Sequence, residues 1–557
     1  MYFKKKTLNF TIACWLVVTL GLSNLLSADE KLSFHESASD IVMHSLEVQP
    51  DKVFLKKLYR QLFFVPVWIT QEDTSPLAKS LFSHMKSDKI LKKESRLYKD
   101  MMALEIYATE LYGSDASLVQ KVDLEFKISQ LYKGYADYTL YGSINWGAFQ
   151  SSLYNLKAKS INAAWETYKP RINAISLLEN AALGANLDQL FKDAMPKEYH
   201  YEALYNMLIK YIEMQENSEW KPVLLTGSLR IGKAYEVVPA LRERLRLLGD
   251  YHTCSESTEG LIYNTCLRDA LVHFKKRHGL VPSVKISKQT ISALNIAIET
   301  KIAKIRLNLD RIKWLNQRNA ERHIMINIPA FTLNFEENGQ LRQQMRVVTG
   351  KPKNPTPIFS NMVQTIVLNP YWNIPKSIIQ KEMIPKLMRN PNAMARKGIE
   401  IHSGWGKGAQ KISGASIDWS QYRYSKSVPF RFAQVPGTRN ALGKVKFLFP
   451  NRYSVYMHDT PSKSLFKRNV RAFSHGCIRL QKPRELLRTF STFNENVDFS
   501  KSQNILKGKK RTYLSLTSKV PVDVVYLTAW VDYNGVLQFR DDIYGYDRMQ
   551  LEAFRQW

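Results

Sequence analysis

Residues 456–480 read YMHDTPSKSLFKRNVRAFSHGCIRL, and this stretch decides how the C-terminal half of the chain is interpreted. Cys477 follows a glycine and has a histidine and an arginine nearby, while His458, at the end of a predicted strand, lies nineteen positions upstream. A cysteine attacks as its thiolate, so near neutral pH it needs a base or a positive neighbour. The spacing lets the chain loop back and bring His458 alongside Cys477, which predicts a nucleophile–base pair.

Two neighbours of Cys477 suit that chemistry. Gly476 lets the backbone approach closely and helps to aim amide groups at an oxyanion. Arg479 supplies a fixed positive charge that can lower the pKa of the thiol or bind a carboxylate. The structural alternative is a chance cluster, in which His475 is held by ordinary hydrogen bonds and Asp459 caps a turn.

The sequence beyond about residue 320 favours short strands with glycine and proline turns, beginning with RHIMINIPAFTLNFEENGQLRQQMRVVTG at residues 322–350. We expect a mainly-β, sandwich- or barrel-like catalytic domain over residues 299–535. Residues 377–430 look helical and loop-like, so we interpret them as an insertion and a candidate lid over the site. Residues 536–557 are set apart as a C-terminal tail.

Most of the chain before this domain is predicted to be helical. Residues 29–225 space apolar side chains at three and four residues, with few glycines and prolines, which predicts a helical scaffold domain. Residues 226–298 predict three helices, and the runs ALVHFKKRHGL (270–280) and TISALN (290–295) resemble a small peptidoglycan-binding domain. The predicted fold class is therefore multi-domain α+β.

The charge and the N-terminus limit the class of partner. A formal net charge of +30 over 557 residues indicates a polyanionic partner, which could be nucleic acid, an anionic membrane face or an acidic wall polymer. Residues 1–28 combine three lysines, an apolar run and small residues, as in a secretory signal cleaved near Ala28. The alternative is an uncleaved membrane anchor. Export argues against a nucleic-acid partner.

Cysteine usage leaves one thiol unexplained. Cys14 lies within the apolar N-terminal run, and Cys254 and Cys266 lie twelve positions apart, where they could form a local disulfide or remain two separate thiols. The sequence contains no C-x-x-C spacing typical of a metal site. Cys477 is therefore the odd thiol, and we expect it to be reactive.

The run HDTPSK followed by SHGCIRL resembles the signature of the L,D-transpeptidase (YkuD-type) family. Further runs resemble the long, multi-domain periplasmic members, namely VVTGKPKNPTPIFS (347–360), LNPYWNIPKSI (368–378) and PGTRNALGKVKFLFPN (436–451). The resemblance covers the chain from about residue 300 to its end. It implies a periplasmic protein that is secreted across, or anchored to, the inner membrane.

The resemblance also implies roles for individual residues. Cys477 would form a thioester with a peptidoglycan stem peptide, and His458 would be the general base, oriented by a backbone carbonyl and not by the Asp459 carboxylate. The implied catalytic set is Cys477, His458, His475 and Gly476, with the backbone amides of 475–477 as the oxyanion hole. The implied substrate-binding set is Arg479, Ser474 and Tyr456.

The implied reaction has two steps and needs neither ATP, a metal nor another cofactor. The thiolate attacks the carbonyl of the third stem residue, D-Ala leaves, and the amine of a second stem takes the acyl group to form a 3→3 crosslink. If water takes the acyl group, the enzyme is an L,D-carboxypeptidase, and if a protein lysine takes it, the enzyme anchors lipoproteins. A different class of protein, a non-catalytic wall-binding structural protein, is a further alternative.

Overall fold

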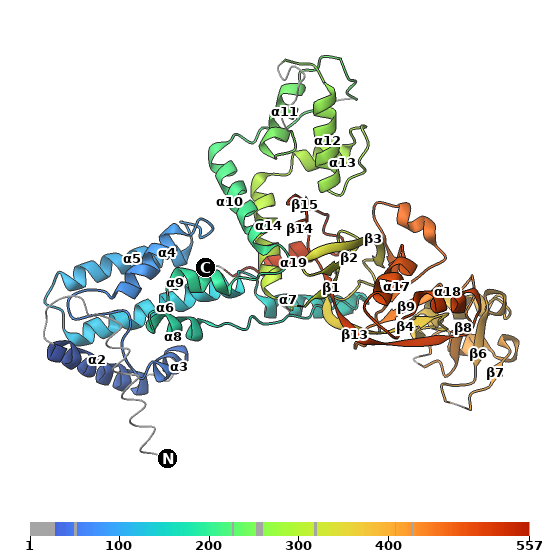
Figure 1. Cartoon of the computed structure of the whole chain (residues 1–557), viewed down its shortest axis with the longest axis horizontal. Coiled ribbons are helices and arrows are strands. Elements are labelled where there is room, and N and C mark those ends of the chain that lie inside the picture. The colour runs from blue at the N-terminus through green and yellow to red at the C-terminus, as the bar shows by residue number, and fades with distance from the viewer. Residues whose placement is uncertain are drawn as a thin grey trace.

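The computed structural model describes residues 28–555, apart from 49–52, 226–227, 252–259, 317–319, 407 and 426. The expected signal or anchor segment at residues 1–28 lies outside this range except for Ala28. Across the described ranges, no helix has the length and apolar content required to cross a membrane. Figure 1 shows a helical lobe, a second smaller helical lobe and a β-rich lobe.

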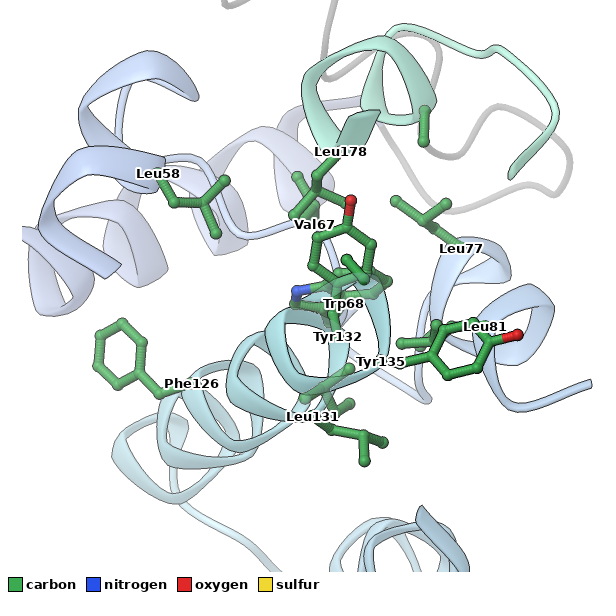
Figure 2. Close-up of a cluster of buried hydrophobic side chains, with 14 of the residues drawn as sticks. Leu58, Val67, Trp68, Leu77, Leu81, Phe126, Leu131, Tyr132, Tyr135 and Leu178 are labelled. Atoms are coloured by element: carbon green, nitrogen blue, oxygen red, sulfur yellow. The ribbon is translucent and has the colours of Figure 1, made fainter. Parts of the chain in front are cut away.

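The first lobe is a helical bundle arranged around the long helix α6 (Leu118–Tyr141). Figure 2 shows its core, where Trp68 and Tyr132 from segments far apart in the sequence pack together. Ser117 begins α6 with a capping box, which satisfies backbone N–H groups at the helix start. The other helices are α2 (Ala28–Val48), α3 (Val53–Gln61), α4 (Pro76–Ser87), α5 (Arg96–Tyr112), α8 (Ala174–Ala182) and α9 (Leu187–Ala194).

The chain leaves this bundle after α6 and returns to it at α8, and the segment between these helices packs against the β-rich lobe. Helix α7 (Trp146–Asn155) contributes Trp146 and Phe149 to the core of the β-rich lobe, and Trp165 joins them through a bridge to Ile358. Burying a large aromatic side chain stabilises a fold in proportion to the apolar area removed from water. These three aromatic side chains are buried against the sheet of the β-rich lobe.

The second lobe contains three helices within residues 226–298, as the periodicity predicted. They are α11 (Val238–Leu247), α12 (Thr265–Arg277) and α13 (Lys288–Leu294). Their core continues into α10 (Tyr201–Asn217), α14 (Ile298–Lys313) and the C-terminal strands. Cys266 is disulfide-bonded, and its expected partner Cys254 lies outside the described residues. We refer to residues 226–298 as the three-helix module.

The β-rich lobe is a barrel-like sheet of nine strands in the order β11-β3-β12-β10-β9-β4-β13-β1-β2, and pairing of β2 with β3 closes it. Helices α17 (Pro483–Ser491) and α18 (Phe499–Lys507) pack against it. The strands are β1 (Arg322–Asn327), β2 (Thr332–Glu337), β3 (Gln340–Gly350), β4 (Phe359–Leu368), β9 (Val445–Leu448), β10 (Met457–His458), β11 (Ala472–Ser474), β12 (Ile478–Leu480) and β13 (Thr512–Val525).

The insertion forms a small subdomain with its own sheet and core, and it is not only helical and loop-like as expected for residues 377–430. Strands β6 (Ile399–His402) and β7 (Lys411–Ile412) lie inside that range. They are too short to show a clear alternation in the sequence. The insertion also contains β5 (Trp372–Asn373), α15 (Lys376–Ile378), the π-helical turn η2 (Ile379–Met383), α16 (Ile384–Leu387), β8 (Arg431–Gln434) and the short 3-10 helices η3 (Ala395–Lys397), η4 (Gly414–Ser416) and η5 (Trp419–Tyr422).

Residues 536–555 are part of the folded core, which corrects their interpretation as a tail. Strand β15 (Leu537–Phe539) pairs with β14 (Ala529–Val531) and buries its apolar side chains in the core of the second lobe. Helix α19 (Tyr546–Glu552) places Asp547 2.8 Å from the guanidinium of the fully buried Arg311 on α14. Residues 536–555 therefore contribute to the cores of both the second lobe and the β-rich lobe.

Candidate active site

The sequence-predicted residues meet on one face of the barrel because β10 lies between β9 and β12. His458 is paired with Arg479 on one side and with Lys446 on the other. Residues paired across neighbouring strands point to the same face of a sheet, and so do residues two apart along one strand. Lys446, His458 and Arg479 therefore share a face with Tyr456 and Cys477, which lie two positions before His458 and Arg479.

The opposite face of the same strands forms the core. Phe447, Met457 and Ile478, each fully buried, alternate with the polar residues. This period of two explains the local sequence: in YMH and CIR the central residue faces inward and its neighbours face the site. The fold thus turns two three-residue runs into one polar surface.

Cys477 carries a free thiol that is protonated at neutral pH. Burial raises its pKa, and this effect outweighs the opposing influence of Tyr456, Lys446 and Arg479. The thiol donates to the carbonyl oxygen of Ser454 across 3.8 Å. Because the thiolate is the nucleophile, this cysteine needs a base to become reactive.

His458 is in the protonation state that a base requires. Burial, followed by the charge of Arg479, lowers its pKa to about 3, so the ring is neutral at physiological pH. Nδ1 lies 2.5 Å from the carbonyl oxygen of Asp459, to which a neutral ring donates, and this leaves the lone pair on Nε2. The Asp459 carboxylate is occupied by Lys463 and by the backbone N–H of Lys444, so a backbone carbonyl orients the ring.

The loop that carries Cys477 is held by internal hydrogen bonds. The buried Ser474 hydroxyl donates to the carbonyl of Cys477 at 2.6 Å and accepts from the N–H of Gly476 at 3.1 Å. Thr356 donates to the carbonyl of Gly476 at 2.8 Å. Ser474 therefore stabilises the loop, and its expected role in substrate binding stays a prediction.

Gly476 is required here for its conformation. Its φ of 115° lies in a region that side chains with a Cβ rarely adopt, whereas the nearest atom to an added Cβ would be 3.8 Å away. Close backbone approach, the expected reason, does not apply. The amide of Gly476 is occupied by Ser474, so of the three expected oxyanion donors only the N–H groups of His475 and Cys477 donate to no acceptor among the described residues.

His475 joins the thiol loop to the insertion. Its Nε2 lies 2.8 Å from Glu382, which belongs to the π-helical turn η2. Burial and then Lys351 lower the pKa of His475, so at neutral pH a neutral ring donates this hydrogen bond. The contact links the candidate lid directly to the residue preceding Gly476.

Two residues in the site were not singled out from the sequence. The Lys446 ammonium lies 3.6 Å from the centre of the Tyr456 ring, and burial lowers its pKa to about 8. Trp372 of β5 is a neighbour of the Tyr456 hydroxyl, whose pKa is raised well above its usual value by burial and then by Cys477. Alternation in KVKF could have indicated Lys446, since it places both lysines on the face opposite Val445 and Phe447.

Arg479 has a buried donor that faces no acceptor in the described part of the chain. Its Nε is buried and has no hydrogen-bond partner among the described residues. A buried N–H without an acceptor is costly, so its position in a site suggests that a ligand supplies the acceptor. Within the described ranges, no group of three or more histidine, cysteine or acidic side chains is placed to hold a metal ion.

Two family models match the chain. Residues 321–500 match the model described as the L,D-transpeptidase catalytic domain, and residues 54–208 match a scaffold domain. These ranges bear out the resemblance and the helical N-terminal region followed by a β-rich catalytic domain. They leave open what the three-helix module binds.

A curated relative agrees with the first match. A Haemophilus influenzae protein named "Putative L,D-transpeptidase" is 32% identical over 277 residues, which are 48% of this chain. The chain spans 54% of that relative's length.

Solved structures of L,D-transpeptidases are also matched. The protein from Stackebrandtia nassauensis matches at 15% identity over 54% of this chain and 97% of its own, with a TM-score of 0.22. The protein from Mycobacterium smegmatis matches at 16% identity over 37% of this chain and 59% of its own, with a TM-score of 0.18. TM-scores this low carry no argument, so the assignment depends on the family model and the curated relative.

Proposed function

We propose that this protein is a peptidoglycan L,D-transpeptidase that acts through Cys477, because residues 321–500 match the model of the L,D-transpeptidase catalytic domain. The observation that carries the proposal is that a protonated Cys477 thiol and a neutral His458 lie on the same face of neighbouring strands of the barrel. A neutral thiol and a neutral imidazole are the resting states from which general-base activation begins.

In the first step, His458 Nε2 takes the thiol proton as Sγ attacks the carbonyl of the third residue of a tetrapeptide stem. The oxyanion that forms is stabilised by the N–H groups of His475 and Cys477, which donate to no other described acceptor. The imidazolium then returns the proton to the departing amine, and D-Ala leaves. Arg479, with its unpaired Nε, is suited to a stem carboxylate.

In the second step, the side-chain amine of another stem attacks the thioester and His458 accepts its proton. The bond from the acyl carbon to Sγ breaks, and the Cys477 thiolate that leaves takes the proton back from His458. The product is a 3→3 crosslink, and the thioester conserves the energy of the bond that was broken, so ATP is not needed. The net charge of +30 favours binding to the anionic wall. We place the protein in the periplasm, with membrane association through its N-terminus.

The insertion supports transfer over hydrolysis. It contacts the thiol loop through Glu382 and the site through Trp372, and a cover over the thioester limits the access of water. Without that cover, the same thioester would be hydrolysed and the enzyme would be an L,D-carboxypeptidase. Transfer to a protein lysine would make it a lipoprotein-anchoring enzyme.

Mass spectrometry of the products formed from a disaccharide-tetrapeptide tests the proposal. The wild type should give a crosslinked tetrapeptide–tripeptide dimer, and Cys477→Ala should reduce it on the order of 10⁴-fold or more. If only tripeptide monomer forms, the enzyme is an L,D-carboxypeptidase and not a crosslinking enzyme. If no product forms but the protein binds sacculi, a structural wall-binding protein is favoured.

A further inference from the structure

The three-helix module and the barrel enclose a cleft of about 410 Å³ that is separate from the thiol site. Ligand sites commonly occupy clefts of this size between domains. One wall comes from residues 276–282 of the module, and the other from β3 and the segments 469–471 and 540–543. We call it the module–barrel cleft.

Specific contacts hold its two walls together. Arg540 lies against the backbone of Gly279, where an added Cβ would come within 2.6 Å of the arginine side chain. Arg540 also donates to the carbonyl of Arg277 at 2.9 Å, and Asn469 donates to the carbonyl of Gly279 at 2.7 Å. The cleft is therefore a built feature of the joined lobes, and neither lobe forms it alone.

The lining carries four cations and a single carboxylate. The cations are Lys276, Arg346, Arg471 and Arg540, and the acid is Asp541. Throughout the described part of the chain, none of the four cations forms an ion pair with a carboxylate. The carboxylates of Asp541 and Asp532 offset part of the charge of Arg540, and an anionic ligand relieves the repulsion that remains among the four cations.

Arg471 shows that the charge is fixed in place. It is 7% exposed, and its guanidinium donates only to backbone carbonyls, including those of Val347 and Phe331. Burial, Arg346 and Arg540 together lower its pKa to about 10, so it stays charged at neutral pH. Neutral carbonyls satisfy its hydrogen bonds but leave its net charge uncompensated.

The cleft lies on the strands that carry the active site. Arg471 directly precedes β11, and its carbonyl accepts from the N–H of Thr349 at 3.0 Å. Arg346 lies on β3, and β3 pairs with β12, the strand that begins at the residue after Cys477. A ligand in the cleft would therefore be held at a fixed position relative to the thiol.

We propose that the module–barrel cleft binds the free carboxylates of stem peptides on a peptidoglycan strand other than the one at Cys477. The identity of this polymer rests on the proposed function, whereas the preference for an anion rests on the cleft itself. The three-helix module would then act with the barrel in holding the wall, through a site to which both contribute.

Carbodiimide coupling tests the proposal directly because it joins a carboxylate to a nearby amine. The full chain with Cys477→Ala, which cannot turn substrate over, is treated with disaccharide-tetrapeptide and carbodiimide, and modified lysines are mapped by mass spectrometry. We expect Lys276 to be labelled far more than Lys288, an exposed lysine of the same module outside the cleft. Adding Arg346→Gln should reduce labelling of Lys276 about tenfold, the loss of one charge-assisted contact.

Arg342→Gln is the matched control, because it removes the same charge from the same strand outside the cleft and should leave the labelling unchanged. Equal labelling of Lys276 and Lys288, or an equal effect of the two arginine changes, would overturn the proposal. So would competition by phosphatidylglycerol vesicles or by a carboxyl-amidated muropeptide, since either would show that carboxylates are not what the cleft selects. Turnover by the wild type tests the thiol chemistry separately.

Discussion

At the scale of the residue, the protonation of the Cys477 thiol is set by its burial and by the charged residues around it. Burial raises the thiol pKa, while Tyr456, Lys446 and Arg479 act in the opposite direction without overcoming it. His458 is kept neutral by the same burial and by the same arginine. In the proposed mechanism the two tasks are therefore separate: the cations stabilise the thiolate once it forms, and His458 removes the proton.

Replacing Lys446 with methionine should shift the thiol pKa upward, because Lys446 is one of the cations that lower it. The pH profile of alkylation of Cys477 by iodoacetamide should then move to higher pH, with slower alkylation at neutral pH. Lys444→Met is the matched control, since the Lys444 ammonium donates to the carbonyls of Leu506 and Gly508. If Lys446→Met leaves the profile unchanged, or if both changes move it equally, then Lys446 does not specifically lower the pKa of the Cys477 thiol.

At the scale of the element, the π-helical turn η2 positions the insertion against the thiol loop. A π-helical turn inserts an extra residue into a helix and often occurs at functional sites. Here it presents Glu382 to His475, while Ile379 and Met383 of the same turn are buried in the core of the insertion. The single polar contact is therefore supported by apolar packing behind it.

Glu382→Gln should loosen this connection and let water compete for the thioester. The contact is partly exposed on both sides, so we expect a change of about two- to fivefold in the ratio of tripeptide to crosslinked dimer, in favour of tripeptide. Glu382→Asp should restore part of the ratio. Glu400→Gln, which affects the pair with Lys411 in the same insertion, should leave the ratio as in the wild type. An unaltered ratio in Glu382→Gln would show that the insertion does not exclude water through this contact.

At the scale of the whole molecule, the helical bundle is joined to the barrel lobe at the end of α6. The N–H of Ser143 donates to Asp310 of α14 at 2.7 Å, and the indole of Trp314 donates to the carbonyl of Tyr141 at 2.8 Å. Gly142 lies between these contacts with a φ of 71°. An added Cβ there would lie 2.0 Å from the Asp310 carboxylate, so only glycine fits.

Gly142→Ala should open this junction. The unfavourable φ costs about 1–2 kcal/mol, and displacement of Asp310 from the amide of Ser143 adds to that cost. Hydrogen exchange of the segment around Ser143 should become faster by at least about tenfold. Gly184→Ala is the control, because Gly184 also has a positive φ but no atom lies within 4 Å of an added Cβ. Equal exchange in the two variants would show that conformation alone, and not the junction, is responsible.

Several features of the molecule could be predicted from the sequence because they depend on local patterns. The spacing of apolar residues predicted the helical bundle and the three helices of the module, and the run SHGC singled out the thiol and carried the resemblance to the L,D-transpeptidase family. The alternation of apolar and polar residues around Met457 and Ile478 predicts which side chains share the face of the candidate site, because successive side chains of a strand point to opposite faces.

Other features depended on tertiary structure because they arise from residues far apart in the chain. Only the pairing of β9 with β10 brings Lys446 beside His458, and only the folded insertion brings Glu382 to His475. Burial, which sets the protonation of Cys477 and His458, is a property of the assembled core and has no local signal. Likewise, the cations of the module–barrel cleft are spread over residues 276–540, and only the contact of the two lobes concentrates their charge.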